Sequence, residues 1–231
     1  MQLRRDPFIL FAHRGDNRNF TENTISAFNS SLSAGYRAME LDLVRLKDGN
    51  VVVFHDDNLK RICGADRDIG DISQSEFKSI FPDLVTFDEL CSHFSSSDIE
   101  INLEIKDDPE TFDLIKDQAK MLKHPLISSF NADVVDRAAE AGMECAYLFN
   151  SMYSFLKRKF FLKKRRVHIP ARLILNYFFF RFIFSGYDIY CYTVNDSKTV
   201  KRLMEYPFVK GVFTDRVDLR SELLSMNFHI V

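Results

Sequence analysis

Three carboxylates and a lysine lie on two short apolar segments, at spacings that give each pair a common face. Glu40 and Asp42 are two residues apart in AMELDLV, and Glu104 and Lys106 have the same spacing in NLEIK. Residues two apart in an extended chain point to the same side. A single carboxylate on a strand is often a solvated edge residue, but the apolar residues alternating through 39–43 indicate a buried element.

Buried carboxylates of like charge need a cation beside them. Burying Glu40 and Asp42 next to each other is costly unless a positive charge neutralises them. Adding Glu104 gives three oxygen ligands, a set that suits a hard ion such as Mg²⁺ or Ca²⁺ rather than zinc. We therefore expect these residues to bind a divalent cation, and the sequence does not choose between Mg²⁺ and Ca²⁺.

Two histidines follow apolar segments in the same part of the chain. His13 and Arg14 come directly after FILFA, and His55 ends VVVFH. Imidazoles exchange protons near neutral pH, so one ring can take a proton while the other gives one. Arg14 and Lys106 would hold an anionic group, and arginine suits a pair of phosphate oxygens. A cation, two histidines and two basic side chains around one anion predict cleavage of a phosphodiester.

The elements that position these residues alternate between helix and strand. The strands are expected near Phe8–Ala12, Ala38–Leu43, Ile101–Ile105, Leu126–Ser129, Glu144–Phe149, Val167–Ile169, Ile189–Val194 and Gly211–Thr214. Eight helix–strand units in a chain of this length predict an α/β fold, a single TIM (β/α)8 barrel over residues 1–231. In such a barrel the active site lies at the carboxyl ends of the strands.

One connection departs from this alternation. Asp48-Gly49 lies between two apolar runs, which is a signal of a tight hairpin. The second strand is therefore expected to continue into a small antiparallel excursion that ends at His55. The stretch of about 57–91 is then an insertion before the third strand, where a lid or a wall could form.

Composition restricts the class of protein. The chain has 231 residues, of which 46% are hydrophobic and 28% charged, and these fractions exclude a disordered chain. A net charge of −2 argues against nucleic-acid binding, which usually needs a basic excess. Leu173–Phe184 is too short to span a bilayer and predicts a buried helix. We expect a cytoplasmic protein and leave its oligomeric state open.

The order of the motifs resembles that of a known family. AHRGDNRNFTENT, AMELDLVRLKDGNVVVFHDDNL and LEIK are followed by SSFN, YTVN and GVFTD, and the matches run from residue 8 to about 218. This set resembles the glycerophosphodiester phosphodiesterase family. The chain departs from the family pattern at Thr21, where proline is usual, and at Tyr192, where tryptophan is common.

The resemblance implies a TIM barrel and hydrolysis of glycerophosphodiesters to glycerol 3-phosphate and an alcohol. The following residues match the family's site: His13 and His55 as the acid–base pair, Glu40, Asp42 and Glu104 as metal ligands, and Arg14 and Lys106 as phosphate contacts. Glu22 matches an active-site glutamate, which we expect to orient the His13 ring. Phe130, in SSFN, and Tyr192 are expected to line the substrate pocket. The family mechanism uses the substrate's own glycerol hydroxyl as nucleophile, giving a cyclic phosphate that water opens.

Three alternatives remain open on the sequence alone. The first is a lysophospholipase D that acts on membrane-derived substrates. The basic and aromatic segment Ser154–Arg166 could give such a protein a weak membrane-surface contact. The preferred interpretation of this segment is a solvated helix face. The second is a barrel that serves as a binding module without catalysis. The third is a phospholipase C that acts on inositol lipids. His93, His124, His168 and His229 have no motif around them and are interpreted as surface or loop residues.

Overall fold

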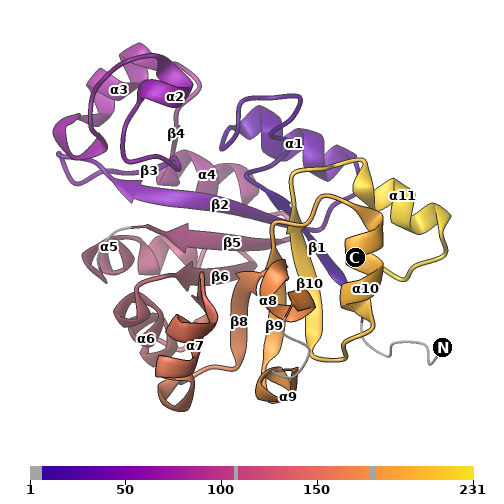
Figure 1. Cartoon of the computed structure of the whole chain (residues 1–231). Coiled ribbons are helices and arrows are strands. Elements are labelled where there is room, and N and C mark those ends of the chain that lie inside the picture. Colours follow the sequence, from indigo (N-terminus) through magenta and orange to yellow (C-terminus); the bar gives the residue numbers. More distant parts are fainter. Residues whose placement is uncertain (1–6, 107–108, 177–180) are drawn as a thin grey trace.

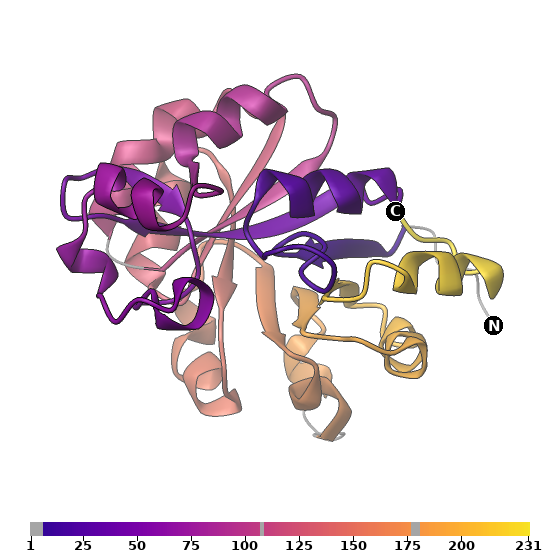
Figure 2. The ribbon, with the colours of Figure 1, turned by 90° about the horizontal axis from the view of Figure 1, so that it is seen from above.

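A closed ring of parallel strands forms the centre of the molecule (Figures 1 and 2). The computed structural model describes residues 7–106, 109–176 and 181–231. The ring strands are β1 (Ile9–His13), β2 (Ala38–Arg45), β5 (Glu100–Ile105), β6 (His124–Ser129), β7 (Glu144–Leu148), β8 (Arg166–Pro170), β9 (Asp188–Tyr192) and β10 (Val209–Thr214). They follow one another in chain order, and pairing of β1 with both β10 and β2 closes the ring. The predicted TIM barrel and its eight strands are confirmed.

Helices cover the outside of the ring (Figure 2). They are α1 (Ile25–Ser33), α4 (Phe87–Phe94), α5 (Pro109–Ala119), α6 (Ala132–Glu140), α7 (Met152–Arg158), α8 (Ala171–Asn176), α9 (Arg181–Phe184), α10 (Ser197–Met204) and α11 (Leu219–Ser225), with a 3-10 turn η2 (Lys159–Phe161) after α7. Met39, Leu41 and Leu43 belong to the large apolar core, which also contains buried residues of these helices. Alternation along β2 therefore leaves Glu40 and Asp42 facing the barrel interior.

Packed side chains fill the barrel interior below the carboxyl ends of the strands. Phe11, Tyr190 and Phe213 form a separate apolar cluster there, and the Phe11 and Phe213 rings stack at 4.7 Å. At the amino end of β8, Arg166 pairs with Glu100 at 2.7 Å and lies 4.1 Å from the centre of the Tyr190 ring. The interior is therefore a filled core, and the residues of the predicted site lie at its carboxyl end.

The predicted hairpin after β2 is present. β2 pairs with β3 (Val51–Val53), which pairs with β4 (Val85–Thr86), and both pairings are antiparallel. Between β3 and β4 lie α2 (Lys60–Cys63), the 3-10 turn η1 (Ile69–Asp71) and α3 (Gln74–Ile80). Phe54 and Phe77 pack edge to face in an apolar cluster that the inserted segment shares with the β2–β3 hairpin. Hairpin and segment therefore have a small core beside that of the barrel.

One sequence prediction about the helices holds only in part. Leu173–Phe184 was expected to be a buried helix, and the residues described within it are helical, in α8 and α9. Leu173 and Phe184 are buried, whereas Phe182 is 85% exposed; residues 177–180 lie outside the described part. None of the described helices combines the length and the apolar character that a bilayer crossing requires.

Candidate active site

The residues singled out from the sequence surround one cavity at the carboxyl end of the barrel. The cavity has a volume of about 210 Å³. It is lined by His13, Arg14, Glu40, His55, Asn102, Glu104, Lys106, Phe130, Leu148, His168, Tyr192, Thr193 and Phe213. Parallel strands bring their carboxyl ends to one edge of a sheet, so residues far apart in the sequence meet here. Of the predicted site residues, Asp42 and Glu22 lie behind this lining and contact it.

The three predicted metal ligands are together. One carboxylate oxygen from each of Glu40, Asp42 and Glu104 lies within 4.8 Å of the others. Register explains this proximity, because Glu40 lies beside Asn102, and Asp42 beside Glu104, in the pairing of β2 with β5. Glu40 and Asp42 are only 2% and 1% exposed. The arrangement is a buried cluster of negative charge.

The donor set fits a divalent cation. The Glu40 Oε1 atom is buried and accepts no hydrogen bond from any part of the chain that the structure describes. Burial and the charge of Asp42 raise the pKa of Glu40 to about 8, and the same two causes raise the pKa of Glu104. A cation at this point would remove both penalties, because it favours the ionised carboxylates and gives the free oxygen a partner.

Two basic side chains border the cluster. Lys106 Nζ lies 2.9 Å from Asp42 Oδ1 and also contacts Glu104. Arg14 Nε lies 3.0 Å from Asp42 Oδ2. Burial alone would raise the pKa of Asp42, but Lys106 and Arg14 lower it more, so this carboxyl stays ionised. Asn23 Nδ2 also donates to Asp42 Oδ2 at 3.0 Å.

A tight left-handed turn places Arg14 above the cluster. Arg14 has a φ of +57° and Gly15 a φ of +76°. The Arg14 amide donates to the Glu40 carbonyl at 2.9 Å and to its Oε2 at 3.1 Å. A Cβ at Gly15 would lie 2.7 Å from the carbonyl carbon of Ala27. Glycine is therefore required at 15, both for the backbone conformation and for the close approach of α1.

His13 is held by a carboxylate from the far end of the chain. Its Nδ1 lies 2.7 Å from Asp215 Oδ1, and its Nε2 lies 3.8 Å from Glu40 Oε2. Burial would lower the pKa of His13, but Glu40 and the hydrogen bond to Asp215 raise it more. Asp215 also accepts from Asn17 Nδ2 and Asn195 Nδ2, each at 2.7 Å. With Nδ1 occupied, Nε2 is the nitrogen available for proton transfer.

His55 has the same kind of support from a different carboxylate. Its Nδ1 lies 2.6 Å from Asp56 Oδ1. Arg61, from α2 of the inserted segment, donates to both oxygens of Asp56, from Nε at 2.6 Å and from Nη2 at 2.9 Å. Hydrogen bonds from Arg61 and from His55 lower the pKa of Asp56 to about 2. The inserted segment therefore completes the surroundings of a predicted catalytic residue.

The expectation that Glu22 orients the His13 ring is wrong. Glu22 accepts from Arg14 Nη1 at 3.0 Å and from Arg61 Nη1 and Nη2 at 2.9 and 2.7 Å. Asp215 occupies the position beside His13 that was expected for Glu22. Glu22 instead links Arg14 to Arg61 of the inserted segment.

Aromatic side chains form one wall of the cavity. Phe130 and Tyr192 meet edge to face, with ring centres 6.4 Å apart. Tyr192 Oη donates to the Phe149 carbonyl at 2.9 Å, which fixes the ring. Phe130 is half exposed at the mouth. Both residues therefore have the placement expected of a substrate wall.

His168 was interpreted as a surface or loop residue, and this is wrong. It lies in the middle of β8, is 1% exposed and lines the cavity at the carboxyl end of the barrel. Its ring packs on Phe213 with 4.8 Å between centres. Burial and the nearby Arg166 lower its pKa well below the usual value, so the ring is neutral. The sequence could have indicated this burial, because His168 is the central residue of the predicted strand Val167–Ile169.

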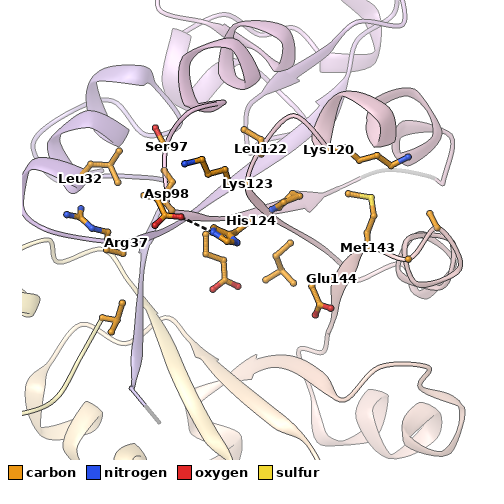
Figure 3. A pocket seen from close by; sticks show the side chains of 17 residues that line it. Leu32, Arg37, Ser97, Asp98, Lys120, Leu122, Lys123, His124, Met143 and Glu144 are labelled. Atoms are coloured by element: carbon orange, nitrogen blue, oxygen red, sulfur yellow. Dashed lines mark hydrogen bonds and ion pairs between the residues drawn. The ribbon is translucent and has the colours of Figure 1, made fainter.

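A larger cavity of about 1200 Å³ lies at the opposite end of the barrel (Figure 3). It is formed around the amino ends of β5, β6 and β7, and Asp98 contacts His124 in it at 3.0 Å. Lys123 and Glu144 also border it, so its walls carry both signs of charge. It contains none of the carboxylate cluster or of the two supported histidines, and we do not assign it to the chemistry.

Comparison with protein families gives a match over most of the chain. Residues 13–219 match the family model described as "Glycerophosphoryl diester phosphodiesterase family". A glycerophosphodiester phosphodiesterase of Caldanaerobacter subterraneus subsp. tengcongensis is 31% identical over 42% of this chain and 45% of its own length. The human protein lysophospholipase D GDPD1 is 38% identical over 35% of this chain and 26% of its own length. The chain thus aligns with less than half the length of these relatives.

Solved structures match over nearly the whole chain. A glycerophosphodiester phosphodiesterase of Thermotoga maritima has a TM-score of 0.81 and 31% identity, covering 94% of this chain and 98% of that one. A phosphodiesterase of Oleispira antarctica, in complex with the product sn-glycerol 3-phosphate, has a TM-score of 0.80 and 22% identity, covering 94% and 96%. The second likeness is one of fold.

Proposed function

The chain belongs to the glycerophosphoryl diester phosphodiesterase family, and on that premise we propose that it hydrolyses glycerophosphodiesters to glycerol 3-phosphate and an alcohol. One observation carries the proposal. His13 and His55 each have Nδ1 on a carboxylate, and both open onto the cavity that holds the three-carboxylate cluster. Glycerol 3-phosphate, the expected product, is also the product bound in the Oleispira antarctica structure.

In the proposed reaction the phosphate lies between the two histidines. Arg14 and Lys106 bind its non-bridging oxygens, because their charges lie at the rim of the carboxylate cluster. One histidine takes a proton from the attacking hydroxyl through Nε2, and the other gives a proton to the leaving alcohol. Asp215 and Asp56 hold these rings in orientation, and Asp215 also stabilises the protonated form of His13.

Glu40, Asp42 and Glu104 would hold a divalent cation, Mg²⁺ or Ca²⁺. When bound, the cation supplies Lewis-acid polarisation of a phosphoryl oxygen. The described residues that line the cavity include no serine or cysteine, and their hydroxyl groups are those of Tyr192 and Thr193. We place the nucleophile on the substrate, as its glycerol hydroxyl, followed by water.

The test is release of glycerol 3-phosphate from glycerophosphocholine, followed with a coupled dehydrogenase. We expect turnover with Mg²⁺ or Ca²⁺, loss with EDTA and recovery when the ion is added back. Glu40→Gln should abolish both turnover and ion binding measured by calorimetry. Glu205→Gln, at an exposed position on the helix side of the barrel, is the matched control and should retain both. Full turnover of Glu40→Gln under chelation would refute the metal assignment.

A lysophospholipase D is the second candidate, supported by the human relative of that name. It differs in the substrate, which is inserted in a membrane or micelle. Choline release from lysophosphatidylcholine without turnover of glycerophosphocholine would favour it over the first proposal. A barrel without catalysis is disfavoured, because the paired histidines, the basic side chains and the carboxylates converge on one cavity.

A further inference from the structure

One stretch of the chain carries positive charge only. From Cys145 to Tyr187 the sequence has nine lysines and arginines and no aspartate or glutamate. The whole chain, in contrast, has 33 acidic residues against 31 basic ones. The stretch begins in β7 and ends just before β9, so it contains α7, η2, β8, α8 and α9. None of the proposed phosphate or metal contacts belongs to it.

Three phenylalanines of this stretch are almost fully exposed. Phe160 and Phe161 in η2 are 82% and 79% exposed, and Phe182 in α9 is 85% exposed. The segments around these two elements contact each other: Tyr187 Oη, just after α9, donates to the Lys159 carbonyl at 2.7 Å, and the Phe155 ring of α7 packs on the Phe184 ring of α9 at 4.9 Å. Large apolar side chains exposed to water on segments that pack together are typical of an interaction surface.

Basic side chains with no acidic partner among the described residues lie on the same segments as these rings. Lys157 and Arg158 end α7, and Arg165 precedes β8; all three are exposed and form no ion pair within the described ranges. Lys159 Nζ lies 4.7 Å from the centre of the Phe160 ring. We call Lys157–Phe161, Arg165 and Phe182 the aromatic–basic surface. Its charges remain available to a partner.

We propose that the aromatic–basic surface docks onto an anionic lipid bilayer. The phenylalanines would enter the interface, while the lysines and arginines meet acidic headgroups. A second copy of the chain is a poor occupant, because it would bring two purely positive surfaces together. Nucleic acid is disfavoured by the overall charge of −2. A surface of lipid phosphates and carboxylates complements both the rings and the charges.

Docking there has a consequence for the catalytic cavity. η2 precedes β8 and α9 precedes β9, so the aromatic–basic surface lies at the amino ends of the strands. Figure 1 shows α9 beyond the start of β9. The catalytic cavity lies at the carboxyl ends, on the other side of the barrel. A docked molecule would therefore direct its catalytic mouth toward water and toward soluble diesters.

The test is sedimentation of the purified protein with vesicles, which needs no turnover. We expect binding to phosphatidylcholine vesicles that contain roughly one third phosphatidylserine, none to phosphatidylcholine alone, and weaker binding as salt is raised. Phe160→Ser/Phe161→Ser and Lys157→Glu/Arg158→Glu should each weaken binding at least about tenfold. Phe182→Ser tests α9 separately, and its exposure makes misfolding a poor explanation for any loss.

Matched controls lie elsewhere on the surface. Lys201→Glu/Arg202→Glu makes the same charge change in the last turn of α10, and Leu114→Ser removes an exposed apolar residue from α5. Both should bind vesicles like the wild type, and all variants should keep their turnover of soluble diester. Absence of binding to anionic vesicles, or equal losses in the controls, would overturn the proposal. So would light scattering that showed a dimer lost in the phenylalanine variants.

Discussion

Asp215→Asn tests whether the carboxylate that directly follows the last barrel strand supports the His13 ring. Asp215 Oδ1 accepts from His13 and from Asn17, and Oδ2 accepts from Asn195, each at 2.7 Å. The substitution keeps the shape and removes the charge. An amide at 215 also places an NH₂ group where an acceptor is needed, either toward His13 or toward Asn195. Asn195 cannot turn its oxygen to meet it without releasing Thr214 Oγ1, which donates to that oxygen at 3.0 Å.

The size of the effect follows from the hydrogen bond that loses its charge. Hydrogen bonds to charged groups contribute about 1.5–3 kcal/mol, which corresponds to a fall in kcat of roughly 10- to 150-fold at about 1.4 kcal/mol per tenfold. KM should change by less than about threefold, because Arg14 and Lys106 still bind the phosphate. The pH dependence should move as well. Asp215 raises the pKa of His13 by stabilising its protonated form, so its loss shifts the limb due to His13 to lower pH.

The assay is kcat and KM for glycerophosphocholine over a range of pH, with the melting temperature as the check on folding. Asp188→Asn, an exposed aspartate at the opposite end of the barrel, is the matched control and should behave like the wild type. A kcat within about threefold of the wild type, with an unchanged pH profile, would show that Asp215 does not support a catalytic ring. If Asp215→Asn does not fold, Asn195→Ala takes its place, because it removes the hydrogen bond that holds Asp215 beside His13.

The remaining predictions concern the inserted segment and the turn after β1. Arg61→Met should lower kcat by about threefold to tenfold. The melting temperature should change little, because a half-exposed ion pair adds little stability. Arg67→Met, in the same segment, is the control and should leave kcat unchanged. Gly15→Ala should lower the free energy of unfolding, measured in urea, by about 1–3 kcal/mol, because of the positive φ and the contact with Ala27. A variant as stable as the wild type would contradict this. Phe77→Ala should destabilise the inserted segment by about 3–5 kcal/mol, seen as faster amide hydrogen exchange there than in the barrel strands.

Local patterns in the sequence predicted most of the fold. Each ring strand is a short apolar run whose residues alternate or are buried on both faces, so its position depends on neighbours along the chain. The hairpin at Asp48-Gly49 is also a local signal and is present. The prediction that Leu173–Phe184 is buried fails at Phe182, because the apolar character of this stretch did not indicate that Phe182 would be exposed. Apolar composition predicts burial only when a neighbouring element is there to cover the side chain.

The sequence by itself determined which groups are available for chemistry: a spacing of two put Glu40 and Asp42 on one face of a strand, and the motifs supplied two histidines. Only the tertiary structure decided which carboxylate supports which ring. His13 and Asp215 are 202 residues apart, and they meet because β1 and β10 close the barrel. Arg61 reaches Asp56 from the inserted segment between β3 and β4. Spacing along a strand is fixed by covalent geometry, whereas these contacts depend on how strands and loops far apart in the chain come together.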